Sequence, residues 1–164
     1  MIDKTFTITQ ENVSGQFISI RETISKFFTT IPGFFETVFN YMKMLMDDNS
    51  RRISHFIHGE LYEPYKAEFP KKMILHILIF YDEFETNNPL ASHAGVYKIG
   101  GTYFSLLCVP PEHYSKLENF FLTLLFNSEY RKVTSFGNQK CFQPIIDELL
   151  EMESTPIRGL PLIT

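Results

Sequence analysis

The amino-acid sequence predicts an α+β fold: N-terminal helices, then a partial β-meander of about three strands, then a helix. Apolar residues recur at helical spacing over 17–46, and apolar runs of strand length follow near 73–81, 96–109 and 117–126. A further amphipathic pattern occupies 142–152. Strands and helices grouped in separate blocks are typical of α+β domains.

The N-terminal part of the chain is predicted to be mostly helical. The first 15 residues have no clear period and are expected to form an irregular lead-in. Helices are expected over about 17–31 and 34–46, because Pro32-Gly33 between them disfavours a continuous helix. Both segments are rich in Phe, so the two helices are expected to pack face to face. A third, shorter helix is expected to contain Ile53, Phe56, Ile57 and Leu61.

The strands are predicted from short apolar runs. Residues 73–81 are rich in β-branched and apolar side chains, which favours a buried central strand that ends at an acidic cluster, 82–85. In the second strand, 96–109, the pair Gly100-Gly101 indicates a bulge, a tight bend or a hairpin. Residues 117–126 fit a strand or a helix by pattern alone, and their length favours a strand.

The last predicted element is a helix near the C-terminus. Residues 127–140 are polar and are expected to form a loop. Pro144 is tolerated only in the first turn of a helix, so this helix is expected to begin at about 143–144. The chain is therefore divided into a mostly helical region, a core region and an irregular tail, with the boundaries 1–66, 67–153 and 154–164.

Composition limits the class of protein. The net charge of -4 and the pI near 5.7 lack the basic excess typical of a free-standing nucleic-acid binder. Cys108 and Cys141 are expected to be reduced, buried thiols, which suits an intracellular compartment. The N-terminus has no apolar segment like that of a signal peptide, and no apolar run approaches the roughly 20 residues needed to cross a bilayer. We therefore expect an intracellular protein with no membrane span.

Asp82 is the strongest candidate for chemistry. A carboxylate directly after a buried strand would lie at a sheet end, where it could meet solvent or a hard cation such as Mg²⁺. Two-metal phosphoryl transfer needs several carboxylates that converge on ions roughly 4 Å apart, and one Asp does not supply them. The alternative interpretation is a solvated acidic turn after the strand.

Other chemical motifs are weaker. His55 and His58 are three residues apart and could share a helix face as metal ligands, although surface histidines explain the same pattern. His93 and His113 adjoin no Ser or Cys in a nucleophile context. The sequence contains no G-x-S-x-G, P-loop or G-x-G-x-x-G motif. Cys108 lies in an apolar strand and is expected to be a small buried residue.

Four segments between residues 50 and 153 form a distinctive pattern: HFIHGELYEP, ILIFYDEFETNNPLASHAGVYKIGGTYFSLLCVPP, KLENFFLTLLFNSEYRK and FQPIIDELLEME. They resemble transposon-derived DDE transposase-like proteins of animal genomes. The resemblance implies a partial ribonuclease-H-like core whose first strand ends at Asp82. Asp82 would then be the first catalytic carboxylate and a ligand for Mg²⁺ or Mn²⁺. DNA as a partner and a nuclear location are implied in the same way.

The sequence departs from that family after Glu153. The family has a further strand with a second acidic residue, then a cysteine-rich segment and a final acidic residue, whereas the tail here is STPIRGLPLIT. The resemblance therefore implies a truncated or degenerate transposase-like protein that is inactive alone. The alternative hypothesis is a non-catalytic module for protein–protein interaction or self-association, which would use the Phe-rich helices and an unfinished sheet edge.

Overall fold

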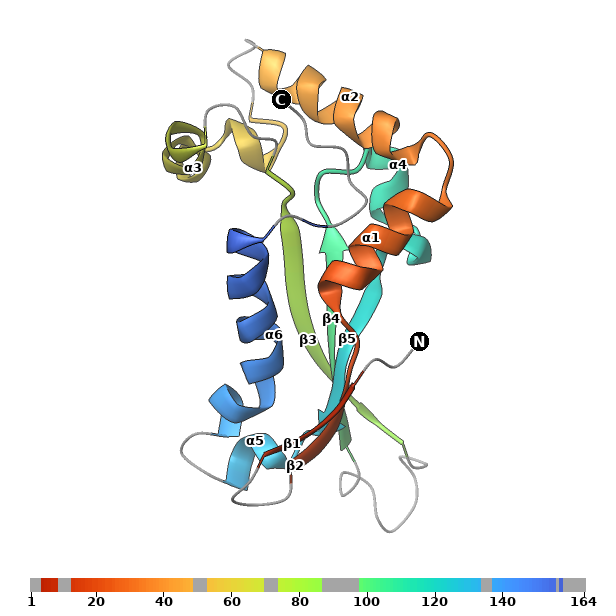
Figure 1. Cartoon of the computed structure of the whole chain (residues 1–164), viewed down its shortest axis with the longest axis vertical. Coiled ribbons are helices and arrows are strands. Elements are labelled where there is room, and N and C mark those ends of the chain that lie inside the picture. The colour runs from red at the N-terminus through yellow and green to blue at the C-terminus, as the bar shows by residue number, and fades with distance from the viewer. Residues whose placement is uncertain are drawn as a thin grey trace.

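One antiparallel sheet of five strands, in the order β1-β2-β5-β4-β3, organises the structure (Figure 1). The computed structural model describes residues 4–8, 13–48, 53–69, 74–86, 98–133, 137–155 and 157. Its strands are β1 (Lys4–Ile8), β2 (Val13–Phe17), β3 (Ile77–Glu85), β4 (Lys98–Leu106) and β5 (Phe121–Asn127). Its α-helices are α1 (Ile20–Thr30), α2 (Phe34–Asp47), α3 (Glu63–Glu68), α4 (Pro111–Tyr114), α5 (Tyr130–Val133) and α6 (Gly137–Ser154). Its 3-10 turns are η1 (Phe56–His58), η2 (Glu60–Tyr62) and η3 (Leu117–Asn119).

The predicted α+β class is confirmed, and three consecutive strands form the expected meander. β3 pairs antiparallel with β4, and β4 with β5, before the chain continues into α5 and α6. The glycine pair leaves β4 unbroken, and the irregularity in its pairing with β5 falls between Thr102 and Tyr103. The ribonuclease-H-like form of this core stays a prediction.

The N-terminal lead-in was predicted wrongly, because its described residues form two strands. β1 and β2 pair antiparallel, and β2 pairs with β5 so that Gly15 lies opposite Phe126. The run Thr5-Phe6-Thr7-Ile8, made of β-branched and aromatic residues, suits such a strand. The pairing of β2 with β5, more than 100 residues later in the chain, is a long-range contact that a local sequence pattern does not reveal. The predicted regions 1–66 and 67–153 therefore share one sheet.

The two predicted Phe-rich helices are present as α1 and α2. α1 begins later than expected, because Phe17 is the last residue of β2 and the Ser19 side chain caps the helix by accepting from the Glu22 N–H at 3.0 Å. The Phe28 ring of α1 packs against Phe34 of α2, with ring centroids 6.0 Å apart. Both rings are buried, so these helices contribute to the hydrophobic core.

The core lies on one face of the sheet. Phe104, Leu106 and Leu124 point to this face and are fully buried. Phe142 of α6 packs on the same face, 5.7 Å from the Phe126 ring. In Figure 1, α6 runs alongside the sheet, and α2 lies beyond one end of the strands. Side chains on the opposite face are more exposed, with Leu78 at 47%.

Three local predictions need correction. Residues 56–68 form two 3-10 turns and a short helix in place of one helix, with Pro64 in the first turn of α3. Residues 117–119 are also a 3-10 turn, so the third strand of the meander starts at Phe121. Residues 130–133 form α5 within the segment 127–140 that was predicted to be a loop.

The last helix also starts earlier than predicted. α6 begins at Gly137, which places Pro144 in the helix interior. Proline there removes one helical hydrogen bond. Tertiary contacts hold the turns before it: Cys141 is fully buried, and the Asn138 side chain accepts from Arg131 Nε at 2.7 Å. The packing of these turns therefore outweighs the preference of proline for the first turn of a helix.

Candidate functional site

Asp82 lies within β3, not after it. β3 extends to Glu85, and it is an edge strand of the sheet, so the expectation of a buried central strand that ends at the acidic cluster is wrong. Asp82 lies opposite Gly101 of β4 and its side chain is exposed. Its Oδ1 accepts a hydrogen bond of 2.8 Å from the Glu83 backbone N–H. The carboxylate thus engages its own strand.

The neighbouring carboxylates point away from Asp82. Side chains alternate between the two faces of a strand, so Glu83 lies on the core face and Asp82 on the opposite face. Glu83 Oε1 accepts from Arg131 Nη1 at 3.1 Å and from the Tyr81 hydroxyl at 3.0 Å. Its charge is therefore already paired with a cation.

Arg131 is the organising side chain on the core face near the end of β3. Its guanidinium lies 4.3 Å from the centroid of the Tyr81 ring, in addition to its bonds to Glu83 and Asn138. Burial is the main cause that raises the pKa of Tyr81 above its usual value. These contacts join α5 and α6 to β3. Sequence reasoning missed Arg131 because it lies in the segment predicted as a loop.

Gly100 makes room for this cluster. A Cβ at position 100 would lie 2.8 Å from a ring carbon of Tyr81, which is closer than side chains pack. A Cβ on Gly101 would meet the Tyr103 ring at the same distance. The paired glycines therefore let two tyrosine rings lie flat over β4, which explains the motif without a bend or a hairpin.

The residues around Asp82 do not by themselves fit a divalent cation. Mg²⁺ needs several oxygen ligands in near-octahedral geometry. Glu83 is paired with Arg131, and among the described residues no three His, Cys, Asp or Glu side chains cluster closely enough to hold a metal. Two surface hollows, of about 430 and 480 Å³, lie on the described part of the protein, and Asp82 lines neither.

His55 and His58 bind backbone carbonyls. His55 caps η1, and its Nε2 lies 2.8 Å from the carbonyl oxygen of Leu107. His58 Nε2 lies 3.0 Å from the carbonyl oxygen of Leu45. The two imidazoles thus join the η1 turn to the end of β4 and to α2, which is a structural role. His113 lies on α4 against the Phe34 ring, and His93 is outside the described residues.

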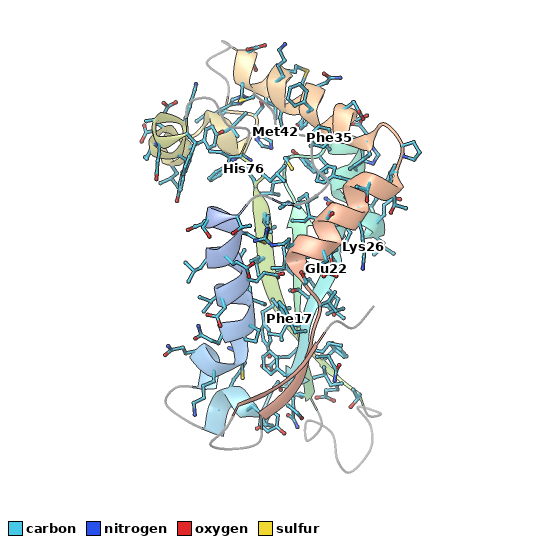
Figure 2. All side chains as sticks on the ribbon, viewed as in Figure 1. Phe17, Glu22, Lys26, Phe35, Met42 and His76 are labelled. Atoms are coloured by element: carbon cyan, nitrogen blue, oxygen red, sulfur yellow. The ribbon has the colours of Figure 1, made fainter. Side chains whose placement is uncertain are left out.

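His76 was not singled out from the sequence, and its environment is unusual. It precedes β3 and is only 9% exposed, close to the η1 and η2 turns (Figure 2). Neither ring nitrogen has a hydrogen-bond partner among the described residues. The rings of Tyr62, Phe56 and His55 surround it, with centroids at 5.1, 5.4 and 6.3 Å. Burial, and then the charge of His55, lower the pKa of His76 to about 4.

The two cysteines are free and buried, as expected. Burial raises the pKa of Cys108 to about 12, so this thiol is protonated and unsuited to nucleophilic attack at neutral pH. Burial also raises the pKa of Cys141. Both thiols therefore act as small core side chains.

Comparisons with known proteins identify no relative. No family model matches the chain, and no match is found among curated proteins or solved structures. None of the described helices is long and apolar enough to cross a membrane.

Proposed function

We propose that this chain is a protein-interaction module that accepts an additional β-strand at the free edge of β3. The observation that supports this is the position of β3, which within the described residues pairs only with β4. A free edge displays unpaired backbone N–H and C=O groups, which an extended segment can bind by strand addition.

The side chains of β3 suit this function. Edge strands normally carry charges, Pro or bulges that prevent pairing. In β3 these features are absent from Ile77 to Tyr81, where every side chain is apolar or aromatic. Leu78 is 47% exposed on the face opposite the core. An added strand would cover this surface as well as pair with the backbone.

The Phe-rich helices do not supply this binding surface. Phe28 and Phe34 are buried, and Phe27 packs against the core with its ring 4.9 Å from that of Phe121. The sheet edge therefore remains as the stronger of the two features that an interaction module would use.

A peptide selection tests the proposal. A library of random seven-residue peptides is selected on the whole chain and counter-selected on Ile79→Pro, which removes an edge N–H and fixes φ at a position where edge strands tolerate Pro. We expect peptides rich in β-branched residues that bind the wild type and lose binding to the variant. Peptides that bind the wild type and Ile79→Pro equally well would contradict strand addition. The same conclusion would follow if no peptide binds and the wild type is monomeric.

The second candidate function follows from the resemblance to DDE transposase-like proteins. It is supported by the order of elements, because β3, β4 and β5 followed by α6 is the order that this resemblance implies. In this role, Asp82 would be the first carboxylate of the acidic set and a ligand for Mg²⁺ or Mn²⁺. The partner would be DNA, and the location would be the nucleus. As described above, the surrounding residues do not complete such a site, so we propose that this chain does not cleave DNA by itself.

Two measurements test this second candidate. Titration of the chain with Mg²⁺ or Mn²⁺, followed by NMR at the Asp82 amide beside an Asp82→Asn control, detects a metal site. Saturable binding that is lost in the control would support the transposase-like role. Plasmid nicking by the wild type that disappears in Asp82→Asn would contradict the proposal of an inactive chain and favour catalysis over strand addition.

A further inference from the structure

The backbone groups of β3 that face outward can be assigned from one hydrogen bond and the alternation of the ladder. The Leu107 N–H donates to the His76 carbonyl at 2.9 Å, so at His76 the backbone points toward β4. In an antiparallel ladder, alternate residues direct their hydrogen-bonding groups to the same side. The outward groups of β3 therefore belong to the odd-numbered residues, Ile77, Ile79, Tyr81, Glu83 and Glu85.

Asp82 divides this outward edge into two parts. The Glu83 N–H, one of the outward donors, is already bonded to the Asp82 carboxylate at 2.8 Å. A strand that paired with Glu83 would have to displace this bond and approach two acidic side chains. Among the described residues, no side chain accepts a hydrogen bond from the outward N–H groups of Ile77, Ile79 or Tyr81. Pairing is therefore favoured in the apolar half of β3 and disfavoured in the acidic half.

If two copies of the chain pair through β3, the contrast between its apolar and acidic halves favours one register. With Ile79 opposite Ile79 of the second copy, only outward groups from the apolar half pair, and Ile77 lies opposite Tyr81. The exposed Leu78 then lies opposite Phe80 on the face away from the core. If Glu83 lay opposite Glu83, pairing would have to break the bond between the Asp82 carboxylate and the Glu83 N–H in both copies.

We propose that the strand that binds the β3 edge is β3 of a second copy, antiparallel and centred on Ile79, with Asp82 as the residue that fixes this register. This proposal rests on the proposed function of strand addition and identifies the strand that would bind at the β3 edge. Two sheets would then join into one continuous sheet. The acidic halves of the two strands would point in opposite directions, which keeps their charges apart.

Disulfide trapping tests the register. Residues directly opposite in a hydrogen-bonded antiparallel pair have Cα atoms about 5.5 Å apart, which a disulfide can bridge. We expect Ile79→Cys to form a cross-linked dimer under mild oxidation. Ile77→Cys and Tyr81→Cys are matched controls, since equivalent cysteines would be offset by four residues, about 13 Å. The native cysteines are buried.

Sedimentation equilibrium on the whole chain tests the association itself. We expect the apparent mass to rise from 19.2 kDa toward twice that value with concentration, and to stay monomeric in Ile79→Pro. If Ile79→Pro does not fold, the cysteine variants still decide the outcome. A wild type that is monomeric throughout, or equal cross-linking at all three positions, would overturn the proposal. If the wild type is monomeric but peptides bind it and lose binding in Ile79→Pro, strand addition still occurs at this edge. The added strand would then come from a different partner and not from a second copy.

Discussion

The buried imidazole of His76 predicts a specific loss of stability in acid. Its ring is 9% exposed and has no hydrogen-bond partner among the described residues. The groups around it that can titrate are His55, Tyr62 and the Cys108 thiol. The ring is therefore held neutral in the folded protein, and its protonation favours unfolding.

The sign and size of the effect follow from linkage. The pKa of His76 falls from 6.5 to about 4 on folding, so between these values the unfolded chain binds more protons than the folded chain. Stability is therefore lost as the pH falls through this window. The loss due to this group is about 2 kcal/mol between pH 7.5 and pH 5, and about 3 kcal/mol below pH 4.

His76→Phe isolates this contribution, because a ring is retained and the titrating group is removed. We expect the variant to be at least as stable as the wild type at pH 7.5, since the imidazole nitrogens make no hydrogen bond that would be lost. At pH 5 the variant should exceed the wild type by about 2 kcal/mol more than at pH 7.5.

Urea denaturation at several pH values between 4 and 7.5 measures these differences. Phe56→Leu is the matched control, because it changes a ring in contact with His76 and leaves the imidazole in place. It should lower stability with the same pH slope as the wild type. Identical slopes for wild type and His76→Phe would refute the reasoning, and so would an NMR titration that places the His76 pKa near 6.5.

Three further substitutions probe contacts that hold the fold together, each measured by urea denaturation. Glu148→Ala removes the α6 carboxylate that accepts from the first backbone N–H of α1 at 2.7 Å, and should cost about 1–2 kcal/mol. Asn119→Ala leaves the buried N–H and C=O of Leu106 without their side-chain partner, and should cost about 3 kcal/mol. Gly100→Ala pushes a methyl group into the Tyr81 ring and should cost about 1–3 kcal/mol. Changes below about 0.5 kcal/mol, the range of ordinary surface substitutions, would contradict each assignment.

The local sequence pattern was sufficient to predict an element where that element buries one continuous apolar face. The helical spacing of apolar residues over 17–46 predicted α1 and α2, and Phe28, Phe34 and Val38 of this set are buried. The apolar run before Asp82 predicted a strand, and the buried environment of Cys108 followed from its apolar neighbours. In these segments the local preference and the tertiary environment agree.

Long-range contacts decided the remainder. β1 and β2 are strands because β2 pairs with β5, and α6 extends before Pro144 because Arg131 and the core hold its first turns. The candidate site changed for the same reason. Asp82 was expected after a central strand, whereas the sheet order places it within an edge strand, with its carboxylate on the neighbouring N–H.

Local sequence patterns were enough to predict the α+β class, the two Phe-rich helices, the three-stranded meander and the buried state of both cysteines. Each follows from period and composition within a short window. The edge position of β3, the pairing of Arg131 with Glu83 and the aromatic rings around His76 could not be predicted in this way. These features depend on which distant segments pair with or pack against each residue, and a local pattern does not contain that information.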